Sequence, residues 1–168
     1  MIEGLKEKVV IVTGGGHGIG RAYCHGFAEA GAKVVVADID APAAEKVTGE
    51  VIQQFDGKAL AAKTDVANET STQDMAKLAL DKFGRIDVLV NNAAIFATIP
   101  MNRGGIDTID PAEWDRMMLV NLKGLFSAAA PCCRRCVNKS PARSSTSLPA
   151  PCSTAAPDGF TTSLRKPA

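Results

Sequence analysis

Glycines cluster near the start of the chain, where residues 13–20 read TGGGHGIG. Gly14 can form the tight turn at the end of a strand, Gly18 has no side chain to hold the backbone away from a phosphate, and Gly20 lets a helix pack close to that strand. The free N–H groups at the start of the helix would then face the phosphates of a ligand. The segment therefore predicts a binding site for the pyrophosphate of a dinucleotide.

An acidic residue stands where it could contact the ribose of the same dinucleotide. Asp38 ends the apolar run that starts at Lys33, close to the ~20-residue offset expected for an acid that binds the ribose 2′-OH. A carboxylate accepts a hydrogen bond from this hydroxyl but repels a 2′-phosphate, so Asp38 predicts NAD as the cofactor and disfavours NADP. The basic residues His17 and Arg21, near the expected phosphates, argue in the other direction. The alternative interpretation of the cluster, a glycine-rich surface turn, leaves Asp38 unexplained.

Short apolar runs alternate along the chain with amphipathic segments. Strands are predicted at residues 9–12, 33–37, 58–63 and 86–90, and helices at 19–31, from 42, around 75–83 and at 111–129. This alternation is typical of an α/β protein with a doubly wound parallel sheet, the Rossmann fold, in which each crossover is right-handed. Because parallel strands end at one edge of the sheet, the residues that follow the third and fourth strands would join the glycines and Asp38 there.

Four motifs in this arrangement resemble the short-chain dehydrogenase/reductase family. They are the glycine spacing itself, Asp65-Val66 after the third strand, Asn91-Asn92-Ala93-Ala94 after the fourth, and Asn121 in the last predicted helix. The resemblance runs from about Lys6 to Ala129. The positions that it assigns to the cofactor site are Gly14, His17, Gly18, Ile19, Gly20, Asp38, Asp65, Val66, Asn91 and Ala93.

The resemblance also implies an activity and an assembly. Members of the family transfer hydride between a nicotinamide, of NAD or NADP, and a carbonyl or alcohol on a small-molecule substrate. Their strand order begins 3-2-1-4 with three more strands to follow, and an intact relative is expected to be a homo-oligomer. The expected function is that of an NAD(P)-dependent oxidoreductase.

Asn121 is the one remnant of the catalytic pattern that the resemblance identifies. It interrupts an apolar stripe that includes Trp114, Met118 and Leu122, and a buried amide is costly unless it is hydrogen-bonded. In the family, the matching asparagine holds a water that relays protons to the active-site lysine. The alternative is a structural amide whose hydrogen bonds are satisfied within the protein.

The other catalytic residues of the family are missing. There, a tyrosine acts as general acid/base, a nearby lysine lowers the pKa of that tyrosine and holds the nicotinamide ribose, and a serine orients the substrate oxygen. The single tyrosine here is Tyr23, inside the first predicted helix, and no Tyr-x-x-x-Lys occurs. We therefore expect this chain to be inactive as a dehydrogenase. The alternatives are a nucleotide-binding module without catalysis and a product without function.

The composition changes after residue 130. Residues 131–168 hold six of the nine prolines and four of the five cysteines, with no helical or strand period. We therefore predict a Rossmann domain over residues 1–130, incomplete relative to the family, and an irregular C-terminal tail over residues 131–168 without regular structure. The fourth strand would then be an open edge of the sheet, and the helix that carries Trp114 would lose a packing partner.

Reading the tail in another frame suggests its origin. When the last base of each codon is joined to the first two of the next, suitable codons convert residues 141–149 into Gly-Lys-Ile-Val-Asn-Ile-Ser-Ser. The same shift converts residues 161–166 into Tyr-Ile-Ala-Ser-Lys. These are the missing strand, serine and Tyr-x-x-x-Lys of the family in their proper order. We interpret the tail as an out-of-frame continuation of a dehydrogenase.

Charge and cysteine content argue against other classes of function. A formal net charge of +1 disfavours binding to nucleic acid or to a membrane surface. No leader segment opens the sequence and no apolar run approaches ~18 residues, so the cytoplasm is the expected compartment. Cys133 and Cys136 have metal-ligand spacing but lack two further ligands nearby, so neither a metal site nor a disulfide framework is expected.

Overall fold

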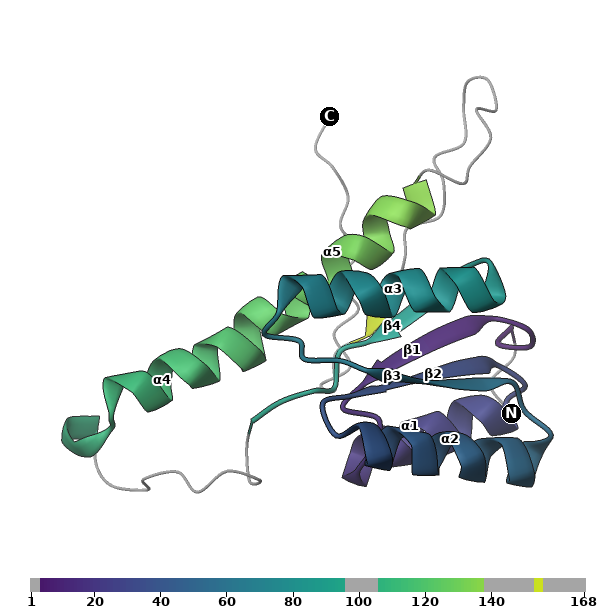
Figure 1. Ribbon diagram of the computed structural model, residues 1–168, viewed down its shortest axis with the longest axis horizontal. Coiled ribbons are helices and arrows are strands. Elements are labelled where there is room, and N and C mark those ends of the chain that lie inside the picture. The colour runs from purple at the N-terminus through teal and green to yellow at the C-terminus, as the bar shows by residue number, and fades with distance from the viewer. Residues whose placement is uncertain (1–3, 96–105, 138–152, 156–168) are drawn as a thin grey trace.

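The computed structural model describes residues 4–95, 106–137 and 153–155, and these residues form a parallel sheet with helices on both faces (Figure 1). The strand order is β3-β2-β1-β4-β5, and every pair of neighbouring strands is parallel. The strands are β1 (Val9–Thr13), β2 (Lys33–Asp38), β3 (Ala59–Lys63), β4 (Val88–Val90) and β5 (Ser153–Ala155). This arrangement confirms the predicted doubly wound α/β fold.

Two pairs of helices enclose the sheet and divide its core into two layers. The helices are α1 (Gly18–Glu29), α2 (Ala41–Phe55), α3 (Glu69–Phe83), α4 (Pro111–Met118) and α5 (Gly124–Val137). In β1, Val9 and Ile11 pack with residues of α3 and α5, whereas Val10 and Val12 pack with residues of α1 and α2. Because the central strands are buried on both faces, they read as unbroken apolar runs and not as an alternating pattern.

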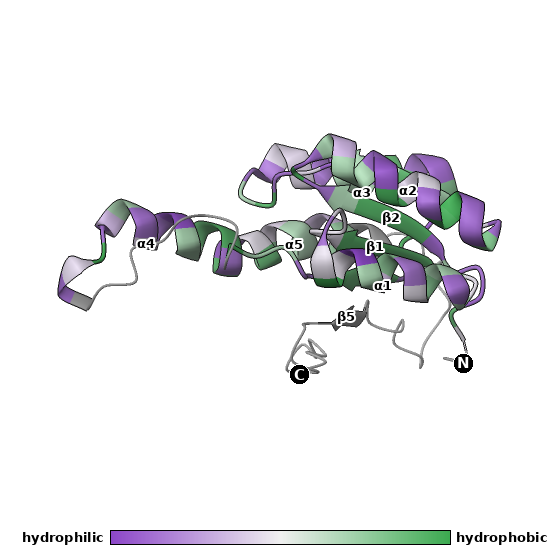
Figure 2. Ribbon diagram, turned by 90° about the horizontal axis from the view of Figure 1, so that it is seen from below, coloured by the Kyte–Doolittle hydropathy of each residue, from purple (hydrophilic) through white to green (hydrophobic). Residues whose placement is uncertain are grey.

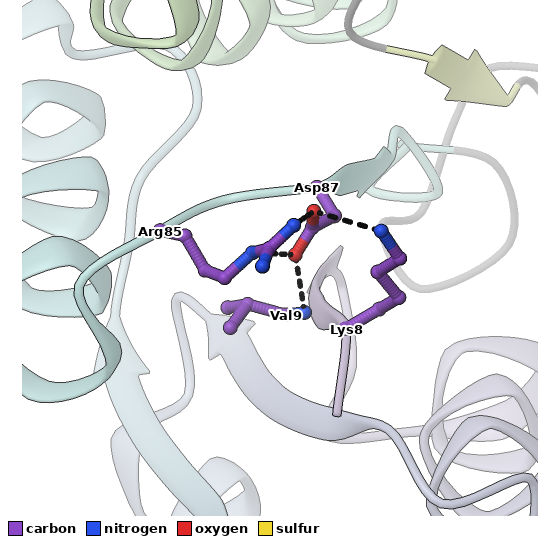
Figure 3. Close-up of polar contacts among 4 residues, drawn as sticks. All are labelled: Lys8, Val9, Arg85 and Asp87. Atoms are coloured by element: carbon purple, nitrogen blue, oxygen red, sulfur yellow. Dashed lines mark hydrogen bonds and ion pairs between the residues drawn. The ribbon is translucent and has the colours of Figure 1, made fainter. Parts of the chain in front are cut away.

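A cluster of charged side chains joins the N-terminal ends of β4 and β1, at the opposite ends of these strands from the glycine segment (Figure 3). The Asp87 Oδ2 atom accepts hydrogen bonds from the Val9 N–H at 2.9 Å and from Arg85 Nε at 2.8 Å, and Lys8 Nζ lies 3.6 Å from Oδ1. Burial raises the pKa of this carboxyl, but the bonds from Arg85 and Val9 and the charges of Arg85 and Lys8 outweigh it. The pKa of Asp87 therefore lies below its usual value.

We expect the Asp87→Asn variant to lose about 1–2 kcal/mol of unfolding free energy at neutral pH, because it loses charge-assisted hydrogen bonds. A carboxyl with a lowered folded-state pKa stabilises the fold above its unfolded pKa of about 3.9, and that contribution disappears as the pH falls toward the folded-state pKa. Urea unfolding at about pH 7 and about pH 3 should show the gap between wild type and variant closing in acid.

Asp81→Asn is the matched control for this comparison. Asp81 pairs with Lys77 within α3, but both side chains are mostly exposed, and exposed pairs contribute little to stability. An equal loss in the control, or a gap for Asp87→Asn that persists unchanged in acid, would contradict the assignment.

The helix predicted at residues 111–129 differs from the observed one in two ways. The π-helical segment η2 (Leu119–Lys123) separates α4 from α5, and α5 runs through Pro131 to Val137. The predicted end of the helix at residue 129 was therefore too early. Ala128 and Cys132 are fully buried against the sheet and α3. We attribute the continuation of α5 to this packing, which offsets the hydrogen bond that the proline removes and the clash of its ring with the preceding turn.

The tail was expected to lack regular structure and to leave β4 as an open edge, and both expectations are wrong at residues 153–155. These residues form β5, which pairs with β4 in the register Val88↔Ser153 and Val90↔Ala155. Without β5, the outer edge of β4 would present unpaired backbone N–H and C=O groups. Such groups can pair with another extended segment whatever its side chains. The rest of the tail, residues 138–152 and 156–168, lies outside the described residues.

The apolar stripe predicted around Asn121 is not buried as a whole, since Met118 is half-buried and the stripe's other named members are exposed. Figures 1 and 2 show α4 extending away from the sheet, and none of its residues is buried. Trp114 and Leu122 are 53 % and 64 % exposed. Among the described residues, no helix is long and apolar enough to cross a membrane.

Candidate cofactor site

The segment between β1 and α1 adopts a backbone that its glycines make possible. Gly14 and Gly18 have φ values of +64° and +48°, in the left-handed region that side chains disfavour. A Cβ atom at Gly20 would lie 1.9 Å from the carbonyl oxygen of Gly14. Gly20 therefore lets the start of α1 pack directly against the glycine turn, whereas the sequence predicted a close contact between the helix and the strand.

The N-terminus of α1 is open toward a ligand. His17 is the N-cap residue, but its side chain makes no capping hydrogen bond, so the first N–H groups of the helix are not satisfied by that side chain. A Cβ atom placed on Gly18 would have nothing within 4 Å, and the neighbouring Ile19 is exposed. An anion such as a pyrophosphate fits this position, because it can accept hydrogen bonds from the helix N-terminus without steric hindrance.

Asp38 is held against the glycine segment by backbone hydrogen bonds. Its Oδ2 atom accepts from the Gly16 N–H at 2.8 Å and its Oδ1 atom from the Asp40 N–H at 3.0 Å. A Cβ atom at Gly16 would approach Oδ2 to 2.9 Å, so only glycine leaves room for this contact. Each carboxylate oxygen keeps a further lone pair, and a ribose hydroxyl is a suitable donor for it.

Thr13 and Asn92 join the glycine segment to the end of β4. The Thr13 hydroxyl donates to the Val90 carbonyl at 3.2 Å and accepts from the N–H groups of Asn92 and Ala93 at 3.0 and 3.1 Å. The Asn92 amide donates to the carbonyls of Thr13 and Gly14 at 3.0 and 3.2 Å. Asn91, which was assigned to the cofactor, directly follows β4 and is half-buried.

Sequence reasoning missed the positioning roles of Thr13 and Asn92. The signal was present, because Thr13 is a polar residue at the end of an apolar strand and is 1 % exposed. A buried hydroxyl requires partners, and the amide of the Asn-Asn pair was a nearby candidate.

The turn after β3 lies next to Asp38. The Thr64 N–H donates to the carbonyl of Asp38 at 2.7 Å, which brings the end of β3 beside the end of β2. The Asp65 carboxylate accepts from the Ala67 N–H at 2.9 Å and so closes the turn. Val66 is buried. Asp65 and Val66 are thus at the same edge of the sheet as Asp38 and the glycines.

The side chain of Asn121 holds the segment that follows β4. Its Oδ1 atom accepts from the Ile95 N–H at 2.8 Å and its Nδ2 atom donates to the Ile95 carbonyl at 3.0 Å. Asn121 lies in the π-helical segment and is half-buried. Its amide is therefore satisfied by backbone, as the structural alternative for this residue requires.

The basic side chains near the glycine segment lie beside acidic side chains of α2 and of its N-cap. His17 Nε2 lies 3.6 Å from Asp40 Oδ2, and Arg21 Nε donates to Glu50 Oε2 at 2.8 Å. The hydrogen bond and charge of Glu50 raise the pKa of Arg21. Arg21, which argued for NADP in the sequence, thus has a partner within the protein.

Cysteines contribute no visible site in the described part of the chain. Cys24 is fully buried below the glycine segment, and burial, followed by the charge of Asp38, raises the pKa of its thiol to about 12. Cys24 is thus a small residue of the core layer formed with α1 and α2. The described residues contain no group of three or more His, Cys, Asp or Glu side chains that could hold a metal ion, and the side chain of Cys136 lies outside those residues.

Comparison with known proteins extends the match beyond the predicted limit. The family model for short chain dehydrogenases matches residues 8–143, past the end of the resemblance at Ala129. An uncharacterized oxidoreductase of Thermotoga maritima is 37% identical over 135 residues, which cover 80% of this chain and 50% of that protein.

Solved structures give the same result. The 3-ketoacyl-(acyl-carrier-protein) reductase from Brucella melitensis, complexed with NADH, is 35% identical with a TM-score of 0.69, over 80% of this chain and 54% of that one. A 7α-hydroxysteroid dehydrogenase complexed with NADH and 7-oxo glycochenodeoxycholic acid is 34% identical with a TM-score of 0.70, over 80% and 50%. The chain spans about half the length of these relatives. Because the matched residues include the glycine segment and both turns beside it, the chain belongs to the short-chain dehydrogenase family of NAD(P)-dependent oxidoreductases.

Proposed function

We propose that this chain carries the NAD-binding half of a short-chain dehydrogenase for a small carbonyl or alcohol substrate, and that it is catalytically inactive in the form given by the sequence. The observation that carries the cofactor assignment is the Asp38 carboxylate, fixed by the N–H groups of Gly16 and Asp40. A carboxylate in this position accepts a hydrogen bond from a ribose 2′-OH and repels a 2′-phosphate. Two of the solved relatives contain NADH.

The residues proposed to hold the cofactor lie at the C-terminal ends of the parallel strands. Gly14, Gly18 and Gly20 leave space for the pyrophosphate, with His17 and Ile19 beside it at the start of α1. Asp65 and Val66 would border the adenine, while Asn91 and Ala93 would border the nicotinamide half. When bound, the nicotinamide supplies the hydride acceptor or donor of the reaction.

The proposed inactivity follows from the lack of a proton donor. Tyr23 is the single tyrosine, and it packs on α1 against the core layer formed with α2, with its ring centroid 6.4 Å from that of Phe27. It is not followed by lysine at the fourth position, so the pair that moves a proton and holds the nicotinamide ribose is missing. We attribute this to an out-of-frame tail, and sequencing the gene across the codons for Ala128 to Lys139 tests that origin directly.

A nucleotide-binding module without catalysis is the second candidate. It is favoured by the sheet itself, since β1, β2 and β4 and the hydrogen bonds between their ends are present, and β5 covers the edge of β4. Calorimetric titration of the 168-residue chain with NADH separates the candidates from a product without function. A cooperative thermal melt that NADH shifts upward supports binding by the chain as it is, and no heat and no shift would contradict it.

The cofactor preference depends on Asp38. We expect Asp38→Ala to reduce the difference in binding free energy between NADH and NADPH by on the order of 1–3 kcal/mol, because it removes a charged hydrogen-bond acceptor and its repulsion of a 2′-phosphate. The measurement is titration of wild type and variant with each cofactor, together with a thermal melt to confirm folding. An unchanged difference would show that Asp38 does not read the ribose.

A further inference from the structure

The start of α5 touches the turn after β3 through a residue that has no side chain. Gly124 is buried, and a Cβ atom placed on it would lie 2.9 Å from Val66 Cγ2 and 3.3 Å from Val66 Cβ. Real Cβ atoms do not make contacts below 3.0 Å, so any side chain at position 124 must displace either the helix or Val66. Val66 itself is buried, with 7 % of its surface exposed.

The helix is fixed on both sides of Gly124. One turn before it, the Asn121 amide makes two hydrogen bonds to the backbone of Ile95. One turn after it, Ser127 and Ala128 are buried, and Ala128 belongs to the core layer formed with α3. The π-helical segment ends at Lys123, so Gly124 is the first residue of the buried face that α5 presents to the core. Val66 is thus the partner that must yield.

Displacement of Val66 would reach the nucleotide. The Thr64 N–H bonds to the carbonyl of Asp38, so the residues after β3 begin beside the carboxylate proposed to bind the ribose. A base attached to that ribose would lie over the turn that contains Val66, so a shift of this buried valine would move the turn beneath the ring. This step rests on the proposed function.

We propose that Gly124 is a positioning residue for the adenine end of the cofactor. Because it lacks a side chain, α5 seats directly against Val66 and sets the place of that valine in the wall of the adenine site. The glycine touches no cofactor atom and acts through Val66 alone.

The test compares two ligands of the full 168-residue chain by calorimetric titration. ADP carries the adenosine, whereas inorganic pyrophosphate should contact the glycine segment alone. We expect Gly124→Ala to weaken ADP about tenfold, as a displaced wall of a binding site would, and to leave pyrophosphate unchanged. In the chain that also carries Val66→Ala, the added methyl no longer meets Cγ2, so the same Gly124→Ala change should have little further effect on ADP.

Gly26→Ala in α1 is the matched control, because Gly26 is also helical and a Cβ atom there meets nothing within 4 Å. Equal loss of ADP and pyrophosphate in Gly124→Ala, or no loss of ADP, would overturn the inference while leaving the proposed function intact. If wild type binds neither ligand, the proposed function fails and the inference fails with it. If Gly124→Ala does not fold, Val66→Ala alone decides: it should weaken ADP but not pyrophosphate, and unchanged ADP binding overturns the inference.

Discussion

A gene in which the reading frame of the tail is restored should produce an active dehydrogenase, whereas the 168-residue chain should give no turnover above background. Under the proposed out-of-frame origin of the tail, restoration would return a tyrosine to donate the proton at the carbonyl and a lysine to hold the nicotinamide ribose. Positioned acid–base catalysis alone contributes about 10²–10⁴-fold to a rate. The measurement is the absorbance of NADH with a panel of small ketones, aldehydes and alcohols, under identical conditions for both proteins.

The recovered tyrosine provides the control for this experiment. Its replacement by phenylalanine in the restored enzyme should remove turnover but leave NADH binding in place, since the hydroxyl is needed for proton transfer and not for the fold. Robust NAD-dependent turnover by the purified 168-residue chain would show that the tail has been misread. If the restored protein binds NADH but turns over none of the panel, the proposed class of substrate, small carbonyl and alcohol compounds, is wrong.

The parts of the fold that the sequence predicted are those in which side chains alone decide the conformation. The unbroken apolar run of β2 required burial on both faces, and the offset of Asp38 from the glycines followed from the length of a strand–helix–strand unit. A close approach of the helix was expected at Gly20, and the contact that excludes a side chain there is with the Gly14 carbonyl and not with the strand. Local sequence was sufficient for these residues because each conflict or contact arises within one βαβ unit.

The parts that the sequence did not predict depend on contacts between distant segments. The bonds from Asn92 to Thr13 and Gly14 join residues nearly half the chain apart, and nothing local distinguishes Asn92 from Asn91. Pro131 ends a helix by its own preference, but burial of Ala128 and Cys132 continues α5 past it. Ser153–Ala155 has no strand pattern in the sequence, yet it pairs in parallel with β4. Tertiary context overrides local preference in each case.

Gly20→Ala should weaken the affinity for NADH on the order of 100-fold or more, and should lower the unfolding free energy by about 3 kcal/mol. The added Cβ atom would lie 1.9 Å from the Gly14 carbonyl oxygen and 2.6 Å from Asn92 Nδ2. Relief requires that either the glycine turn or α1 move. Movement of the turn breaks the bond from Asn92 to Gly14, and movement of α1 misplaces the N–H groups that would face the pyrophosphate. Titration with NADH and urea unfolding measure the two effects.

Gly26→Ala in the same helix separates this steric effect from helix propensity. Position 26 is exposed and open, so alanine there should stabilise α1 by up to about 1 kcal/mol and leave NADH binding unchanged. The two variants add the same methyl group to one helix and should therefore change stability in opposite directions. If Gly20→Ala retains NADH affinity within a few-fold of wild type, the close contact between α1 and the Gly14 carbonyl is not what shapes the pyrophosphate site.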